Sequence, residues 1–218
     1  MLGVEMPRPT KRHPERGDAR TRLLDAAITV IRTKGFAATS IDDLCGTAGV
    51  TKGSFFHHFE SKEALGVAVA NHWAETTSAF FAAAPYHEPQ DPLARVLAYV
   101  AFRKSIITGE LAQVTCLVGT LVQEIFASSP AVRDACAASI FGHASTLTAD
   151  IAAAKRARRI TADWAPESLA RHTQTVIQGA FVLAKAANDI ALARESLDHL
   201  DQYIRMLFHA GTGEEKPT

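Results

Sequence analysis

Two short helical segments joined by a tight glycine turn constrain the fold more than any other feature of this sequence. The stretch from Thr39 to Leu65 reads TSIDDLCGTAGVTKGSFFHHFESKEAL. Its opening Ser-x-x-Asp has the form of a capping box, and Gly49 is placed to end the first segment after about eight residues. Thr51 can cap a second short helix. This spacing predicts a helix-turn-helix.

Helical periodicity continues through most of the chain. From Ala19 an apolar stripe runs to a glycine stop at Gly35, and Ser61 is placed to cap a longer helix that reaches about Phe81. Prolines between 85 and 92 mark a break. We expect further helices over 92–108, 110–127, 130–158, 166–192 and 196–209. No strand-like alternation with hairpin turns is evident, so the sequence predicts an all-α fold.

Composition excludes several other classes of protein. The 218 residues are 47% hydrophobic and 21% charged, as in an ordinary globular chain. No apolar run approaches the roughly 18 residues that span a bilayer, and the N-terminus has no apolar signal segment. The three cysteines (Cys45, Cys116 and Cys136) form neither a disulfide framework nor a zinc pattern. We therefore expect a cytoplasmic protein without membrane contact, metal or cofactor.

The segment from Arg20 to Trp73 resembles the TetR family of one-component transcriptional regulators. The residues that match in register are Gly35-Phe36, Thr39-Ser40-Ile41, Leu44, Ala48-Gly49-Val50-Thr51, Gly53, Phe55-Phe56, His58-Phe59, Ser61-Lys62 and Leu65. The resemblance implies an N-terminal three-helix DNA-binding domain and a C-terminal helical domain for ligand binding and dimerisation, with no enzymatic activity. We expect a flexible basic arm over 1–18, the DNA-binding domain over 19–62, the second domain over 63–210, and a flexible tail over 211–218.

The resemblance also indicates which residues face DNA: Thr39, Ser40, Thr51, Lys52, Gly53, Ser54, Phe56, His57, His58 and Lys62. Helix N-termini present free N–H groups and a positive dipole end to phosphates, and Lys52 can reach a phosphate or a guanine edge. Phe56 stands where the family most often has Tyr, so a hydroxyl contact to phosphate is lost. His58 has a structural alternative at the helix end, and both lysines have the alternative of a solvated position.

In the second domain the expected ligand pocket draws on Trp73, Phe102, Cys116, Thr120, Gln123, Phe126, Phe141, His143 and His172. Plain core packing is the alternative for each. The pair Gln123-Glu124 is the best clue, because a polar group inside an apolar helix needs a partner. The absence of a basic pocket motif favours a neutral or apolar effector. Cys116 lies in an apolar context, which predicts a buried, unreactive thiol.

Two apolar stripes near the C-terminus predict a homodimer interface. The expected residues are Gly179, Ala180, Leu183, Ala184, Ala187, Leu197, Leu200, Ile204 and Leu207. In the family the last two helices pair with their mates in a four-helix bundle. Packing of the same stripes within one chain is the alternative.

The leading hypothesis is a dimeric repressor that binds a near-palindromic, double-stranded DNA operator and is released by a small molecule. A ligand-binding or enzymatic helical protein is a second hypothesis, although the sequence has no catalytic motif that supports it. A protein–protein adaptor is a third.

Charge is consistent with the first hypothesis once its distribution is considered. The whole chain has 23 Lys and Arg and 23 Asp and Glu. Residues 1–62 carry ten basic against seven acidic residues, whereas 63–218 carry thirteen against sixteen. The small basic excess therefore falls on the arm and the expected DNA-binding domain, which predicts modest non-specific affinity and a shallow salt dependence.

Overall fold

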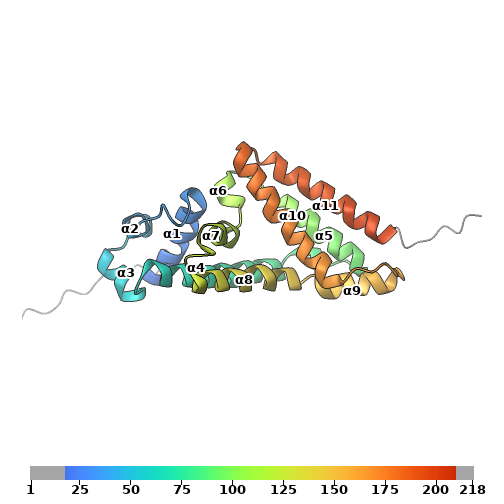
Figure 1. Cartoon of the computed structure of the whole chain (residues 1–218), viewed down its shortest axis with the longest axis horizontal. Coiled ribbons are helices and arrows are strands. Elements are labelled where there is room, and N and C mark those ends of the chain that lie inside the picture. Colours follow the sequence, from blue (N-terminus) through green and yellow to red (C-terminus); the bar gives the residue numbers. More distant parts are fainter. Residues whose placement is uncertain (1–17, 210–218) are drawn as a thin grey trace, which may run out of the picture.

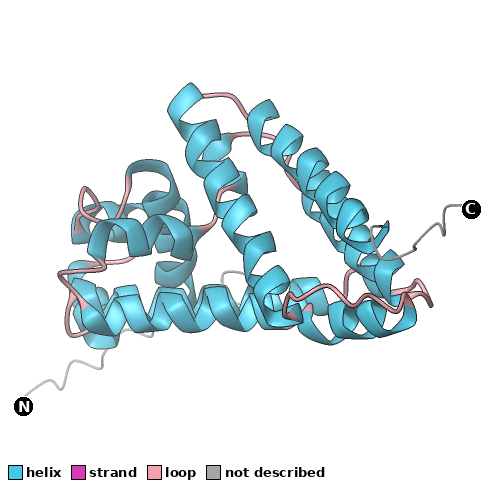
Figure 2. Ribbon diagram, turned by 45° about the vertical axis from the view of Figure 1, so that its right-hand side comes forward, coloured by secondary structure: helices cyan, strands magenta, loops and turns pink. Residues whose placement is uncertain are grey.

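The computed structural model describes residues 18–209, and every regular element in that range is helical (Figure 2). This confirms the predicted all-α class. The elements are α1 (Ala19–Lys34), α2 (Ile41–Ala48), α3 (Lys52–His58), α4 (Lys62–Ala82), the 3-10 turn η2 (Pro85–His87), α5 (Pro92–Ser105), α6 (Leu111–Val114), α7 (Leu117–Ile125), α8 (Pro130–Ser145), α9 (Thr148–Ala157), α10 (Pro166–Ala187) and α11 (Ala191–His209). The predicted basic arm and tail lie outside the described residues.

The helix starts in the N-terminal region follow the capping residues. The Ser40 hydroxyl accepts from the Asp43 backbone N–H at 3.1 Å, and the Asp43 carboxylate accepts from the Ser40 N–H at 2.8 Å, which forms the predicted capping box. The side chains of Thr51 and Ser61 cap α3 and α4 in the same way. Gly49 ends α2 in the left-handed region, at φ +63°, where a side chain would be strained. These local predictions are confirmed.

Two of the expected C-terminal helices are each divided into two. The segment 110–127 divides into α6 and α7, because Thr115 and Cys116 are extended. The segment 130–158 divides into α8 and α9 around residues 146–147. Apolar residues recur at helical spacing on both sides of each division, so the sequence pattern conceals the bend.

The end of α10 comes before residue 192. Asn188 adopts a left-handed conformation at φ +52° and caps the C-terminus of α10, which therefore ends at Ala187. Helix α11 begins at Ala191, earlier than the expected residue 196. Asparagine tolerates this conformation better than most residues with a side chain. The stop signal was therefore present in the sequence, although the apolar period continues beyond it.

Two buried clusters organise the chain. The first joins the α1–α3 head to α4, α7 and α8, and includes Ile31, Phe55, Leu121 and Cys136. The second lies among α5, α9, α10 and α11. The core of the head therefore continues past residue 62, the expected domain boundary, into helices of the second domain. This continuity provides a mechanical connection between the head and the rest of the molecule.

Figure 1 shows the head at one end of the molecule, with α4 and α8 running side by side away from it. Helices α10 and α11 pack together and cover α5, α8 and α9. Within the described range no helix is both long and apolar enough to cross a membrane.

Candidate DNA-binding face and ligand cavity

Helix α3 has one buried face and one open face. The Phe55 side chain is fully buried, whereas Lys52, Gly53 and His57 are exposed and the Phe56 ring is 54% exposed. A Cβ added at Gly53 would approach nothing closer than the Thr51 hydroxyl at 3.7 Å, so the helix surface is flat there. An exposed helix with its N-terminal turn free and one anchoring phenylalanine has the shape needed to enter a groove.

The turn between α2 and α3 is held from behind by Arg22, on α1. Its Nη1 atom donates to the carbonyl oxygens of Ala48 at 3.0 Å and Gly49 at 3.2 Å. These bonds connect α1 to the turn, and so set the position of α3 relative to the rest of the head. Sequence reasoning did not identify Arg22, because nothing in its local sequence indicates contact with a turn 26 residues away.

Three residues expected to contact DNA are engaged inside the head. Thr39 is buried, and its hydroxyl donates to the Gly35 carbonyl oxygen at 2.6 Å. The Ser40 hydroxyl belongs to the capping box. Lys62 Nζ donates to the Ala37 carbonyl oxygen at 3.3 Å, and burial lowers the pKa of its ammonium group. In this conformation these side chains stabilise the connection between α1 and α2.

The other expected DNA-contact residues lie on or beside α3. Lys52 is exposed and pairs with Asp42 at 2.9 Å. The Thr51 hydroxyl accepts from the Ser54 N–H at 3.1 Å. At the far end, the rings of His57 and His58 are 4.9 Å apart. His58 is half-buried and lies 6.4 Å from the Phe59 ring, which agrees with the structural alternative for this histidine.

Glu124, on α7, joins the second domain to the head. Its carboxylate accepts from the Phe36 N–H at 3.1 Å and the Ala37 N–H at 2.8 Å, directly after α1. A Cβ on Gly35 would lie 2.7 Å from the Glu124 carboxylate, so the close approach requires glycine, which adopts φ +88°. We call these contacts the Glu124 clamp. The sequence singled out the Gln123-Glu124 pair as a buried polar group, but both residues are exposed, and Glu124 finds its partners in the backbone that follows α1.

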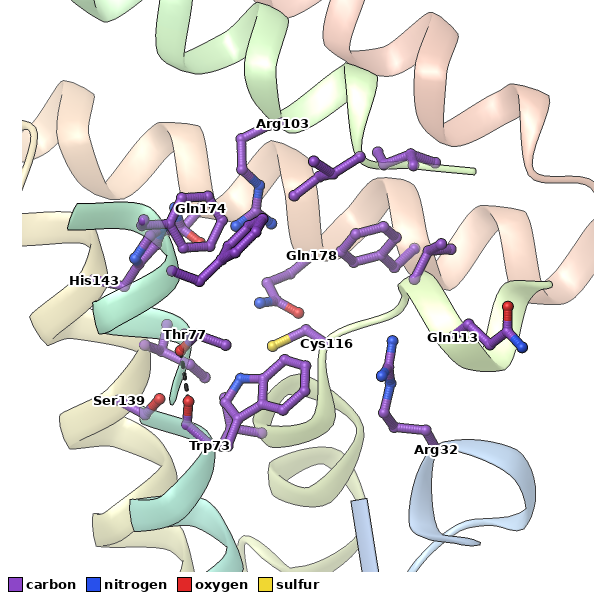
Figure 3. A pocket seen from close by; sticks show the side chains of 18 residues that line it. Arg32, Trp73, Thr77, Arg103, Gln113, Cys116, Ser139, His143, Gln174 and Gln178 are labelled. Carbon is purple, nitrogen blue, oxygen red and sulfur yellow. Dashed lines mark hydrogen bonds between the residues drawn. The ribbon is translucent and has the colours of Figure 1, made fainter. Parts of the chain in front are cut away.

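A cavity of about 210 Å³ lies between α1, α4, α5, α8 and α10 (Figure 3), and we call it the central cavity. Trp73, Cys116 and His143 line it, as expected from the sequence. Thr120 and Gln123 instead line a neighbouring hollow of about 230 Å³, together with Cys116 and Lys185. Cys116 is half-buried between the two spaces, which differs from the expected buried thiol.

Four expected pocket residues lie away from the central cavity. Phe102 packs against the rings of Phe80 and Phe81, at centroid distances of 5.6 and 5.8 Å. Phe126 and Phe141 are 62% and 58% exposed. His172 lies 5.1 Å from the Tyr203 ring on α11. These four residues do not line the central cavity, because the sequence does not show which of several packed helices each side chain faces.

A chain of hydrogen bonds orders one wall of the central cavity. Gln174 Nε2 donates to the Tyr99 hydroxyl at 2.9 Å, and the same hydroxyl lies 2.9 Å from His143 Nε2. Burial, with a smaller effect of nearby Arg103, lowers the pKa of His143 to about 4. His143 is therefore neutral near pH 7 and acts here as a hydrogen-bonding group rather than a charge.

The positive charges in the central cavity come from Arg32 and Arg103, which sequence reasoning missed. Arg32 belongs to α1 and Arg103 to α5, so the two residues are far apart in the chain. Because they are 71 residues apart in the sequence, only the fold shows that they face the same space.

The expected dimer residues divide into two sets. Five of them are buried within the chain and belong to the second core: Ala180, Ala184, Leu197, Leu200 and Ile204. These five are unavailable to a partner, which corrects the prediction; they pack on α5 and on the neighbouring helix. Gly179, Leu183 and Ala187 are exposed, and Leu207 is half-buried.

The exposed apolar surface of α10 and α11 includes Leu183 and three further large side chains, Val182, Tyr203 and Met206, and the four are 39–63% exposed. We call this surface the α10–α11 face.

Comparison with known protein families assigns the N-terminal and the C-terminal parts of the chain to the same family. Residues 23–69 match the family described as "Bacterial regulatory proteins, tetR family". Residues 92–200 match "Tetracyclin repressor-like, C-terminal domain", which alone spans half of the chain. The chain belongs to the TetR family. It is thus a DNA-binding transcriptional regulator with a helix-turn-helix, from a family of regulators rather than enzymes.

Individual relatives match this TetR-family protein over very different lengths. The HTH-type transcriptional repressor DhaR of Mycobacterium sp. (strain GP1) is 25% identical over 195 residues, which cover 89% of this chain and 93% of DhaR. The HTH-type transcriptional repressor NemR of Escherichia coli (strain K12) is 44% identical over 52 residues, 24% of this chain and 26% of NemR.

Solved structures show the same fold. A TetR-family regulator from Agrobacterium tumefaciens superposes with a TM-score of 0.74 at 22% identity, covering 85% of this chain and 96% of that chain. The reduced form of E. coli NemR superposes with a TM-score of 0.69 at 26% identity, covering 84% and 95%.

Proposed function

We propose that this TetR-family regulator is a ligand-responsive repressor, which binds a near-palindromic operator as a homodimer and is released from DNA by a small molecule. The observation that carries the proposal is the Glu124 clamp. It attaches the DNA-binding head to α7, the helix that follows the lining residue Cys116. The names of DhaR and NemR, both repressors, support the direction of control.

The open face of α3 would read the major groove. Thr51, Lys52, Gly53 and Ser54 form its N-terminal turn, where free N–H groups and Lys52 favour phosphate or guanine contacts. The exposed Phe56 ring can contact a sugar or a thymine methyl group. Lys52 would exchange its exposed pair with Asp42 for a phosphate, at small cost because exposed ion pairs contribute little.

A second copy of the chain would cover the α10–α11 face. Large apolar side chains, such as Leu183 on α10 and Met206 on α11, are exposed on these two packed helices, which indicates an interface. Gly179 lies in the middle of α10 with open space around it, which allows another helix to approach closely. Symmetric pairing would set the separation of the two heads, and hence the spacing of the two half-sites.

Ligand binding would change that separation through the first buried core. The central cavity is lined by α1 and α4 as well as by α5, α8 and α10, so its occupant contacts both the head and the second domain. A ligand lowers DNA affinity only if it binds the DNA-free conformation more tightly than the DNA-bound one. The Glu124 clamp then transmits the difference to α1.

A gel-shift assay tests the proposal. The probe is duplex DNA from the region upstream of the protein's own gene, and the competitor is unrelated duplex DNA. We expect a specific complex that weakens as salt is raised. The absence of any specific complex at low salt would overturn the proposed function.

A further inference from the structure

The two arginines of the central cavity differ from Arg95, which has a carboxylate partner. On α5, Arg95 is fixed by Asp150 at 2.5 Å. Neither Arg32 nor Arg103 pairs with a carboxylate within the described part of the chain. Both guanidinium groups line the same space, from opposite sides in Figure 3.

Arg32 is incompletely satisfied. Its Nε atom is buried and has no hydrogen-bond partner, and burial lowers the pKa of its guanidinium group. Its contact in the protein is the face of the Trp73 ring, 5.2 Å from the guanidinium carbon to the ring centroid. Arg103 lies in the same manner 5.0 Å above Phe81. A ring face attracts a cation but supplies neither a counter-charge nor an acceptor for N–H groups.

The remaining lining offers no negative charge. Among the described lining residues there is no aspartate or glutamate. His143 is neutral near pH 7, and the Gln174 amide is already bonded to the Tyr99 hydroxyl. A partly buried cation without a partner is costly, and a bound anion with bidentate geometry removes that cost.

The size and walls of the cavity define the rest of the ligand. About 210 Å³ is less than the roughly 300 Å³ at the lower end of drug-sized pockets, which favours a compact molecule. Aromatic rings of Trp73, Phe80, Phe81 and Phe181 form much of the wall. These rings suit an apolar body, such as a phenyl ring or a short alkyl chain.

We propose that the effector is a compact organic carboxylate, whose anionic group binds the arginines of the central cavity and whose apolar body packs against the aromatic wall. This inference rests on the proposed function for its regulatory consequence. It replaces the neutral or apolar effector expected from the sequence. The observation that carries it is that Arg32 and Arg103, both without acidic partners, line the same largely apolar cavity.

The position of Arg32 explains how a bound carboxylate would affect the head. Arg32 lies in the last turn of α1, and the Glu124 clamp holds the residues that follow this helix. A ligand that contacts both Arg32 and Arg103 in the central cavity would connect α1 to α5. The occupied cavity therefore fixes the end of α1 relative to the second domain.

Calorimetric titration of the purified full-length protein tests the proposal. The probes are benzoate, phenylacetate and hexanoate, each compared with its primary amide, which has nearly the same shape and no charge. We expect at least one carboxylate to bind at least ten-fold more tightly than its amide, a difference of about 1.4 kcal/mol. Equal binding of acids and amides, or no binding by any of the three acids at millimolar concentration, would overturn it.

Substitutions of the two arginines test whether the carboxylate binds in the central cavity. We expect Arg103→Met and Arg32→Met each to weaken carboxylate binding at least ten-fold, and Arg103→Lys to retain part of it. The control is Arg133→Met, on α8, which removes an exposed arginine paired with Asp134 at 2.8 Å. An equal loss in the control would contradict the assignment. If circular dichroism shows that a methionine variant does not fold, the proposal is judged from the Arg103→Lys variant and from the comparison of acids with amides in the wild-type protein.

The gel shift separates this inference from the proposed function. Specific DNA binding that responds to an amide but to no carboxylate would leave the regulator intact and overturn the anionic effector. Carboxylate binding without any specific DNA complex would overturn the proposed function alone. We expect Arg32→Met to keep the DNA complex and to lose its response to the carboxylate.

Discussion

Removal of the Glu124 carboxylate should loosen the head without disturbing the interior of α7. Glu124→Ala deletes two hydrogen bonds from a charged acceptor to backbone N–H groups, at 3.1 and 2.8 Å. Bonds to charged groups contribute about 1.5–3 kcal/mol each when shielded, and less where water can replace the acceptor. Because Glu124 is exposed, we expect the free energy of unfolding to fall by about 2 kcal/mol in total.

Urea denaturation followed by circular dichroism, at fixed protein concentration, measures the change. The matched control is Gln123→Ala, the neighbouring exposed residue, whose amide donates to the Gly119 carbonyl oxygen of its own helix at 2.7 Å. We expect the control to change stability by less than about 0.5 kcal/mol. Equal stability of Glu124→Ala and Gln123→Ala would refute the clamp.

A second variant tests the same contact from the opposite side. Gly35→Ala places a methyl group 2.7 Å from the Glu124 carboxylate and strains a backbone at φ +88°. In the double variant Gly35→Ala/Glu124→Ala the steric conflict is removed, so we expect its loss of stability to be smaller than the sum of the two single losses. Simple additivity would show that the residues do not interact.

Three further predictions concern DNA, the subunit contact and pH. Lys52→Ala should weaken binding to all DNA sequences and reduce the slope of log affinity against log salt concentration by about one per subunit. The control Lys104→Ala, which removes a pair with Asp198 far from the head, should change neither. Fluorescence anisotropy over a salt series measures both variants. Leu183→Glu should convert a dimer into a monomer in light scattering, and Phe126→Glu, equally exposed near the head, should leave the mass unchanged. The folded pKa of His143 lies below its ordinary 6.5, at about 4, so its contribution to stability is complete above pH 6.5 and is lost as the pH falls towards 4. Between pH 7 and 5 this loss is about 2 kcal/mol, and we expect urea denaturation of His143→Gln to show a pH dependence smaller by that amount; equal slopes would contradict it.

The local architecture of the head was predictable because its signals are local. Capping residues and a left-handed glycine act on the backbone within three or four positions, so Ser40, Gly49 and Thr51 could be read directly from the sequence. The same is true of the buried Phe55 and the exposed Phe56, which follow from the helical period.

Partners distant in the chain could not be predicted in the same way. The pattern of an amphipathic helix indicates that one face is buried, but it does not indicate which element covers that face. Leu197, Leu200 and Ile204 were therefore expected to meet a second subunit, although they pack within the chain. Arg32 and Arg103 were missed because their common feature, a shared cavity without an acidic partner, exists only in three dimensions.

Sequencing of DNA selected from a random duplex pool by the purified full-length protein tests the central claim most directly. The account predicts enrichment of an inverted repeat, whose half-site centres lie about 10 base pairs, or a multiple of that, apart. We expect that variants with a substitution at Lys52 or in the α10–α11 face will not enrich this repeat. Enrichment of no sequence, or of a single unpaired half-site that Leu183→Glu binds equally well, would contradict it.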